Sequence, residues 1–246
     1  MLRVFRCDLH VHTCLSPCSD LDMYPSAIVE KAIAEKLDII AICDHNASEN
    51  IPFVMKLTEG KPLTVIPGME ITSSEEVHLL ALFDKLDDLK KIQDIIYDHL
   101  SGTNREEIFG CQAIVNDLDE VEGFNEKFLL GATRLSLIEI IHHIHNCDGL
   151  VIASHIDRES FSVISQLGFI DPDIPLDALE ITHQTGIRKA RARYPELARY
   201  SFVESSDAHF IKDIGQGATT MILEKGTISE LKMAFEHRDG RYIQEL

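Results

Sequence analysis

The chain has 246 residues, enough for a single domain with a sizeable core. It carries 23 Lys and Arg against 41 Asp and Glu, a formal net charge of −18, which disfavours a protein that holds long nucleic acid by its phosphates. A small phosphorylated substrate is compatible with this charge, because bound metal ions can supply local positive charge.

Six cysteines are scattered along the chain without a C-x-x-C pair. The first ten residues, MLRVFRCDLH, lack the apolar run of a secretory signal, and no apolar run is long enough to cross a membrane. We therefore expect a cytoplasmic protein with reduced thiols, organised as one domain over residues 1–246.

Short runs rich in Val, Ile and Leu alternate with amphipathic segments in the first hundred residues. The runs predict strands at residues 2–9, 38–43, 62–72 and 77–83. A proline at its start, with Ile28, Ala32 and Ile33 on one face, predicts a helix over residues 25–37. Apolar positions at helical spacing predict a second helix over residues 86–100.

The second half continues this alternation after a less regular stretch. Residues 111–124 predict a hairpin that turns at residues 116–119, within an insertion near residues 101–133 that we expect to lie over the functional pocket. A helix at 136–146 and strands at 149–155, 176–183, 200–207 and 218–225 follow. Repeated strand–helix units with nearly continuous apolar strands indicate an α/β fold with a parallel sheet covered by helices. Six or seven such units favour closure into a barrel.

Histidines and carboxylates collect at or just beyond the carboxyl ends of the predicted strands, where α/β barrels carry their catalytic groups. In a strand, residues two apart point to the same side, so His10 and His12 point together, as do Asp207 and His209. A single histidine after a strand is more often a polar core or loop residue, but six of them together with carboxylates at strand ends predict a metal centre. Imidazole with carboxylate favours Zn, Mn or Fe over Mg or Ca. The residues at these strand ends are Asp8, His10, His12, Asp44, His45, Glu70, His78, His155, Asp207 and His209.

The motifs DLHVHT, CDHN, GMEI, VHLLAL, ASH and SSDAH occur in this order along the chain. Together they resemble the PHP (polymerase and histidinol phosphatase) family of metal-dependent phosphoesterases. The resemblance implies a distorted (β/α)7 barrel of the PHP type and a centre of two or three divalent metal ions (Zn, Mn or Fe). It implies one ion held by His10, His12, Glu70 and Asp207, a second that Glu70 bridges to and that His78 and His155 hold, and a third held by Asp20, His45 and His209. The loop that carries Asp20 is lengthened by CLSPC, and without Asp20 the site would be binuclear.

The resemblance also predicts phosphoester hydrolysis by hydroxide that the metal ions generate near neutral pH. Asp8 and Asp44 would orient ligand imidazoles through the second ring nitrogen. Asp44 is equally suited to cap the turn before Asn46.

Three further residues are candidates for substrate binding. Arg158, three residues after His155, is the preferred phosphate ligand, because the planar guanidinium fork matches phosphate oxygens. Arg134 is the second choice, and a surface salt bridge is the simpler interpretation for it. His183 follows another predicted strand and is expected at the mouth of the pocket, outside the ligand set.

The predicted substrate is small: a nucleotide, a nucleoside bisphosphate or the end of a short oligonucleotide. A histidinol-phosphate phosphatase is the alternative within the same class. A non-catalytic metal-binding protein, with Cys14 and Cys18 as extra ligands, is the alternative from another class. The matched family pattern does not need these two cysteines, so we expect them to be packing or loop residues.

Overall fold

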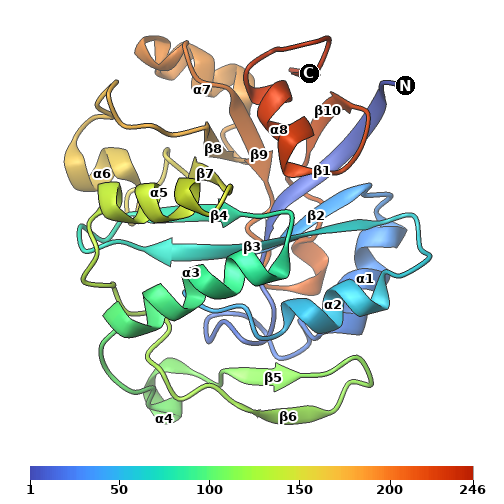
Figure 1. The fold of residues 1–246 in the computed structure, drawn as a ribbon, viewed down its shortest axis with the longest axis vertical. Coiled ribbons are helices and arrows are strands. Elements are labelled where there is room, and N and C mark those ends of the chain that lie inside the picture. Colours follow the sequence, from blue (N-terminus) through green and yellow to red (C-terminus); the bar gives the residue numbers. More distant parts are fainter. Residues whose placement is uncertain (246) are drawn as a thin grey trace.

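The computed structural model describes residues 1–245 and contains a main sheet of nine strands (Figure 1). Their order across the sheet is β11-β10-β1-β2-β3-β4-β7-β8-β9. The strands are β1 (Arg3–Val11), β2 (Ile39–Ile42), β3 (Thr64–Thr72), β4 (His78–Leu82), β7 (Leu150–Ala153), β8 (Ala178–Thr182), β9 (Phe202–Ser205), β10 (Thr219–Leu223) and β11 (Tyr242–Ile243). Every strand predicted from the apolar runs is present.

The sheet curves until the chain that leaves β9 meets β1. His12 N donates to the Ala208 carbonyl at 3.0 Å, and Ala208 N donates to the His10 carbonyl at 3.3 Å. The seven strands β1, β2, β3, β4, β7, β8 and β9 therefore form a nearly closed barrel. The predicted barrel-like α/β fold is confirmed.

The prediction of a parallel sheet is wrong at two strands. Strands β1, β2 and β3 are parallel, and so are β7, β8 and β9, but β4 runs antiparallel to both β3 and β7. β10 runs antiparallel to β1. Only residues 73–77 separate β3 from β4, which is too short for the helical crossover that a parallel pair needs.

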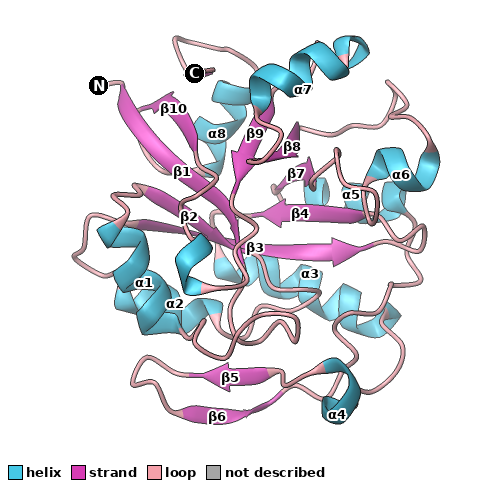
Figure 2. Ribbon diagram, turned by 180° about the vertical axis from the view of Figure 1, so that it is seen from behind, coloured by secondary structure: helices cyan, strands magenta, loops and turns pink. Residues whose placement is uncertain are grey.

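Helices lie around the outside of the sheet (Figure 2). They are α1 (Pro25–Ala34), α2 (Ile51–Leu57), α3 (Leu86–His99), α4 (Glu106–Phe109), α5 (Leu137–Asn146), α6 (Val163–Leu167), α7 (Ile187–Arg193) and α8 (Ile228–Phe235). Local chemistry fixes two of the predicted starts. Pro25 occupies the first position of α1, where its missing N–H costs nothing, and Ser136 with Glu139 forms a capping box at α5. Among residues 1–245, no helix combines the length and the apolar character needed to cross a membrane.

The predicted hairpin forms separately from the main sheet, as β5 (Ala113–Val115) and β6 (Val121–Phe124). Its turn falls at residues 116–119 as expected. Of the insertion at residues 101–133, Leu130 lines the cavity beside Glu70, as expected, but neither strand of the hairpin does. β5 instead packs against the loop after β1, where Ala113 N donates to the Cys14 carbonyl at 3.1 Å.

Candidate metal centre

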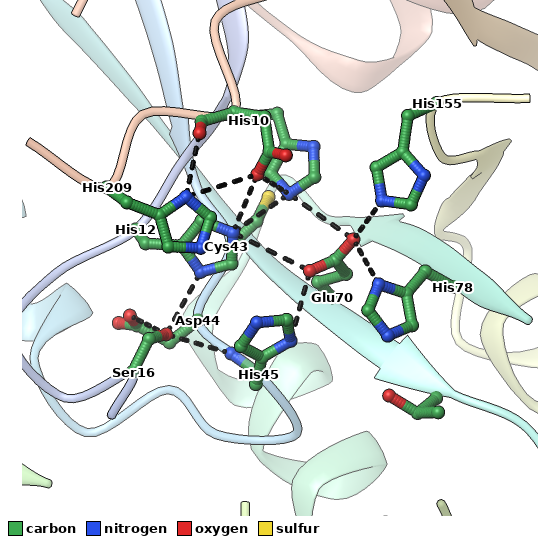
Figure 3. A network of polar contacts seen from close by, with 12 residues as sticks. His10, His12, Ser16, Cys43, Asp44, His45, Glu70, His78, His155 and His209 are labelled. Atoms are coloured by element: carbon green, nitrogen blue, oxygen red, sulfur yellow. Dashed lines mark hydrogen bonds and ion pairs between the residues drawn. The ribbon is translucent and has the colours of Figure 1, made fainter. Parts of the chain in front are cut away.

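Six histidine side chains converge on Glu70 at one end of the barrel (Figure 3). His10 lies in β1, and His45, His155 and His209 follow β2, β7 and β9, so that each lies near the carboxyl end of its strand. His78 is the first residue of β4. Because β4 is antiparallel to its neighbours, its start lies at the rim where they end. The reversed strand therefore delivers its histidine to the same site.

The Glu70 carboxylate is shared among the histidines through both of its oxygens. Oε1 lies 2.9 Å from His78 Nδ1 and 3.2 Å from His155 Nε2. Oε2 lies 3.1 Å from His45 Nδ1 and 3.5 Å from His12 Nε2. A carboxylate in this position would suit the bridging role that the family resemblance implies for Glu70.

Asp207 supplies a second buried carboxylate to the centre. Its Oδ1 lies 3.1 Å from His12 Nε2 and 3.3 Å from His10 Nε2. The two imidazole nitrogens are themselves 3.1 Å apart. On the outer side, Asp207 Oδ2 forms an ion pair with Arg158 Nη2 at 2.5 Å.

These residues fit divalent metal ions. Three groups have ligand atoms within 4.8 Å of one another: His10, His12 and Glu70; His45, Glu70 and His78; and His12, His45 and His209. His155 Nδ1 is buried without a hydrogen-bond partner among the described residues, and His45 Nδ1 faces Glu70 without hydrogen-bond geometry. Buried nitrogens of this kind normally find a partner, and a mixed imidazole and carboxylate set is typical of Zn, Mn or Fe.

The charge states favour cation binding. Burial, followed by repulsion from His209, lowers the pKa of His12 to about 3, and burial holds the pKa of His45 well below its usual range. Burial alone raises the pKa of Glu70, but the neighbouring His78 and His10 outweigh it and hold that pKa well below its usual range. At neutral pH the centre therefore offers the Glu70 carboxylate and the unprotonated imidazoles of His12 and His45, whereas the carboxylates around His10 outweigh its burial and raise its pKa well above the usual range.

Glu180 on β8 supports the centre from behind, and the sequence analysis missed it. Its carboxylate lies 3.1 Å from His10 Nδ1 and accepts the His155 backbone N–H at 3.0 Å. Because a carboxylate can only accept, the proton of His10 belongs on Nδ1 and Nε2 faces the centre. The sequence feature that could have indicated Glu180 is its position as the one charged residue in the otherwise apolar run ALEIT.

The structure corrects the roles predicted for Asp8 and Asp44. Asp8 accepts the backbone N–H groups of Ser206 and Gly215, each at 2.9 Å, and makes no hydrogen bond to an imidazole. Asp44 accepts from Thr13 and from the Ser16 hydroxyl, which lies 3.0 Å from His12 Nδ1. Asp44 thus reaches His12 only through Ser16 and holds the loop after β1 rather than the turn before Asn46. Burial raises the pKa of each of these two carboxyls to about 6.

The side chains of two predicted residues do not face the centre. Asp20 N donates to the His209 carbonyl at 2.9 Å, but the Asp20 side chain is exposed and its carboxylate accepts the Asp22 N–H at 2.9 Å. His12 takes its place beside His45 and His209. Arg134 is exposed and donates to the Asp98 carbonyl at 2.9 Å, which matches the surface interpretation of this residue.

Two hollows open beside the centre, with cavity volumes of about 370 and about 400 Å³. Cys18, Arg158, Asp207 and His209 line both. The predicted phosphate ligand Arg158 is therefore at the site, and His183 lines the second hollow. Cys14 is buried beside the hairpin strand β5, which fits its expected packing role.

The comparison with known proteins agrees with this geometry. The model of the PHP domain family matches residues 8–187. A 5'-3' exoribonuclease (Rnm) from Salmonella typhimurium is 32% identical over 80 residues, which are 30% of this chain and 26% of that protein. The chain thus matches only about a quarter of the length of this curated relative.

Two solved structures share the fold. The lesion-specific endonuclease PfuEndoQ from Pyrococcus furiosus superposes with a TM-score of 0.75 at 17% identity, covering 98% of this chain and 58% of that one. Endonuclease Q in complex with a 27-mer duplex that carries an abasic lesion at its active site superposes with a TM-score of 0.69 at the same identity and coverage. The family match covers most of the chain and agrees with the ordered motifs and the nearly closed barrel. The chain therefore belongs to the PHP domain family.

Proposed function

We propose that the protein is a metal-dependent hydrolase of phosphoester bonds that acts on a small nucleotide-like substrate or on the end of a short oligonucleotide. The observation that carries this proposal is the Glu70 carboxylate, shared among five histidines at distances of 2.9 to 3.5 Å at the wall of an open hollow. The nuclease activities named for the exoribonuclease and endonuclease relatives support a phosphoester substrate.

The chain's own residues would divide the work as follows. His10, His12, Glu70, His78 and Asp207 would hold divalent ions, with His45, His155 and His209 completing the set. Such ions supply polarisation of phosphoryl oxygens and activation of water near neutral pH. Arg158 would donate to the phosphoryl oxygens that face away from the centre, and Asp207 holds its guanidinium in place. Glu180 keeps the His10 ring oriented.

The test is Glu70→Gln, with the exposed Glu76→Gln as the matched control. Because one carboxylate faces two ligand groups, the variant should lose metal content and at least about 100-fold in kcat/KM. Elemental analysis and hydrolysis of bis(p-nitrophenyl) phosphate in Mn-loaded protein measure the two effects.

Two outcomes would contradict the proposal. Wild-type turnover in Glu70→Gln would show that the reaction does not depend on this carboxylate. A wild-type protein that holds two or three ions per chain yet hydrolyses neither phosphomonoesters nor phosphodiesters would support the alternative of a non-catalytic metal-binding protein.

A further inference from the structure

The two hollows beside the metal centre share an inner wall, and each has an outer wall of its own. The shared wall contains Arg158, Asp207 and His209. The first hollow continues over Glu70, His78 and His155. The second continues away from the centre, over side chains that the proposed chemistry does not use. A phosphate held by Arg158 would therefore have space on two sides.

Each hollow has an exposed aromatic ring in its outer wall. Phe161 lies in the first hollow, is 39% exposed, and stacks on His78 with a ring-centroid distance of 4.6 Å and an interplanar angle of 19°. Phe210 lies in the second, is 46% exposed, and has Lys212 Nζ 5.4 Å from its ring centroid. A single exposed aromatic ring is ordinary, but two that flank an anion-binding side chain match the way in which proteins stack successive bases of a single strand.

The remaining wall of the second hollow is polar. His183, Gln184, Asp213 and Gln216 line it, so that donors and acceptors surround the one aromatic ring. This combination suits a heterocyclic base or a sugar and does not suit an alkyl chain. The second hollow therefore has the chemistry of a nucleoside site.

We propose that the second hollow binds the nucleoside on one side of a scissile phosphodiester, stacked on Phe210, while the nucleoside on the other side stacks on Phe161. This inference rests on the proposed function and narrows its substrate to phosphodiesters flanked by two nucleosides. In the reaction, the oxygen of a water bonds to phosphorus and the P–O bond to one nucleoside breaks. One water proton goes to the departing oxygen, and the other is lost to solvent from the new phosphate group.

The test compares Phe210→Ala with wild type on two substrates, a dinucleoside monophosphate and bis(p-nitrophenyl) phosphate. Loss of stacking should lower kcat/KM for the dinucleoside monophosphate by about 5- to 150-fold, mainly through KM, because stacking on an aromatic ring is worth about 1–3 kcal/mol per base. The loss for the aryl diester should be at least about fivefold smaller. Phe210→Tyr, which keeps the ring, should restore most of the loss. Phe169→Ala is the matched control, since Phe169 is 65% exposed and lines neither hollow.

A substrate lacking one base makes the test more specific. If Phe210 stacks on the base that this substrate lacks, Phe210→Ala should lower kcat/KM for this substrate no further. The loss of the ring and the base together should then equal the loss of either alone. Equal losses on both diesters, or no loss on either, would overturn the inference. A wild-type protein that hydrolyses the aryl diester but not the dinucleoside monophosphate would also overturn it and leave the proposed function standing. Failure to hydrolyse either substrate would count against the proposed function itself.

Discussion

Glu180 shows how one buried side chain can hold two residues of the centre at once. Its carboxylate contacts the His10 ring, in β1, and the His155 backbone, just after β7. Although burial of the ring opposes protonation, the charges of Glu180 and Asp207 raise the pKa of His10 well above its usual range. The position of the His10 ring therefore depends on Glu180, a residue that has no proposed contact with the substrate.

We expect Glu180→Gln to lower metal affinity by about 10- to 100-fold, because the neutral amide no longer fixes the ring of His10 through a charge-assisted bond. Competition with a chelator measures the affinity, and thermal unfolding of the metal-free protein checks that the fold persists. Glu204→Gln is the control, since Glu204 lies on the adjacent strand β9 and accepts the Ile187 N–H outside the centre. Metal affinity equal in the two variants would show that Glu180 has no positioning role.

The histidines that meet at the centre could be predicted because strand alternation fixes where each side chain points. His10, Glu70 and His155 needed only the strand pattern and the rule that catalytic groups gather at one rim. Asp20 could not be placed in this way, because its loop folds back on itself and its carboxylate accepts a local N–H. Glu180 was missed because its significance depends on its neighbour across the barrel, which no local pattern encodes.

At the scale of elements, Asn50 attaches the β5–β6 hairpin to the barrel. Its fully buried amide donates to Thr13 Oγ1 at 2.9 Å and to the Ala113 carbonyl at 3.1 Å. Its side-chain oxygen accepts the Val115 N–H at 3.0 Å. One side chain therefore joins the hairpin to the loop that carries the residues around His12.

We expect Asn50→Ala to lower the free energy of unfolding by about 2–4 kcal/mol, because it leaves buried donors and acceptors without partners. Hydrogen exchange should rise across residues 111–124 before it rises in the barrel strands. Chemical denaturation and exchange measured by mass spectrometry test both effects, with the exposed Asn146→Ala as control. Unchanged exchange in residues 111–124 would show that the hairpin is held by other contacts.

The existence of the elements could be predicted more completely than their directions. Apolar runs, Pro25 and the Ser136 capping box mark strands and helix starts locally. Strand direction instead depends on the connection that precedes the strand. The five residues between β3 and β4 could have indicated a reversal, whereas the longer connection before β10 allows either direction.

At the scale of the whole molecule, the net charge of −18 opposes the substrate that the centre is proposed to bind. Two or three divalent ions and Arg158 would reverse the sign of the field near the reacting phosphate, but only over a short distance. Beyond that distance, further phosphates of a longer strand would meet a predominantly acidic protein. The molecule would therefore select for short substrates or for the ends of strands through repulsion.

This leads to a salt dependence opposite in sign to that of a basic nuclease, whose affinity falls as salt rises. At an ionic strength of about 10 mM, where the screening length is about 30 Å, KM for a twelve-nucleotide strand should exceed KM for a dinucleoside monophosphate. Raising KCl to about 200 mM should lower the ratio of these two KM values about threefold, because salt screens the repulsion of the distal phosphates. A strand with uncharged methylphosphonate linkages beyond the first two nucleotides is the control and should show no such change. If KM for the charged strand instead rises with salt while the control stays constant, the distal phosphates are attracted, and selection by repulsion is ruled out.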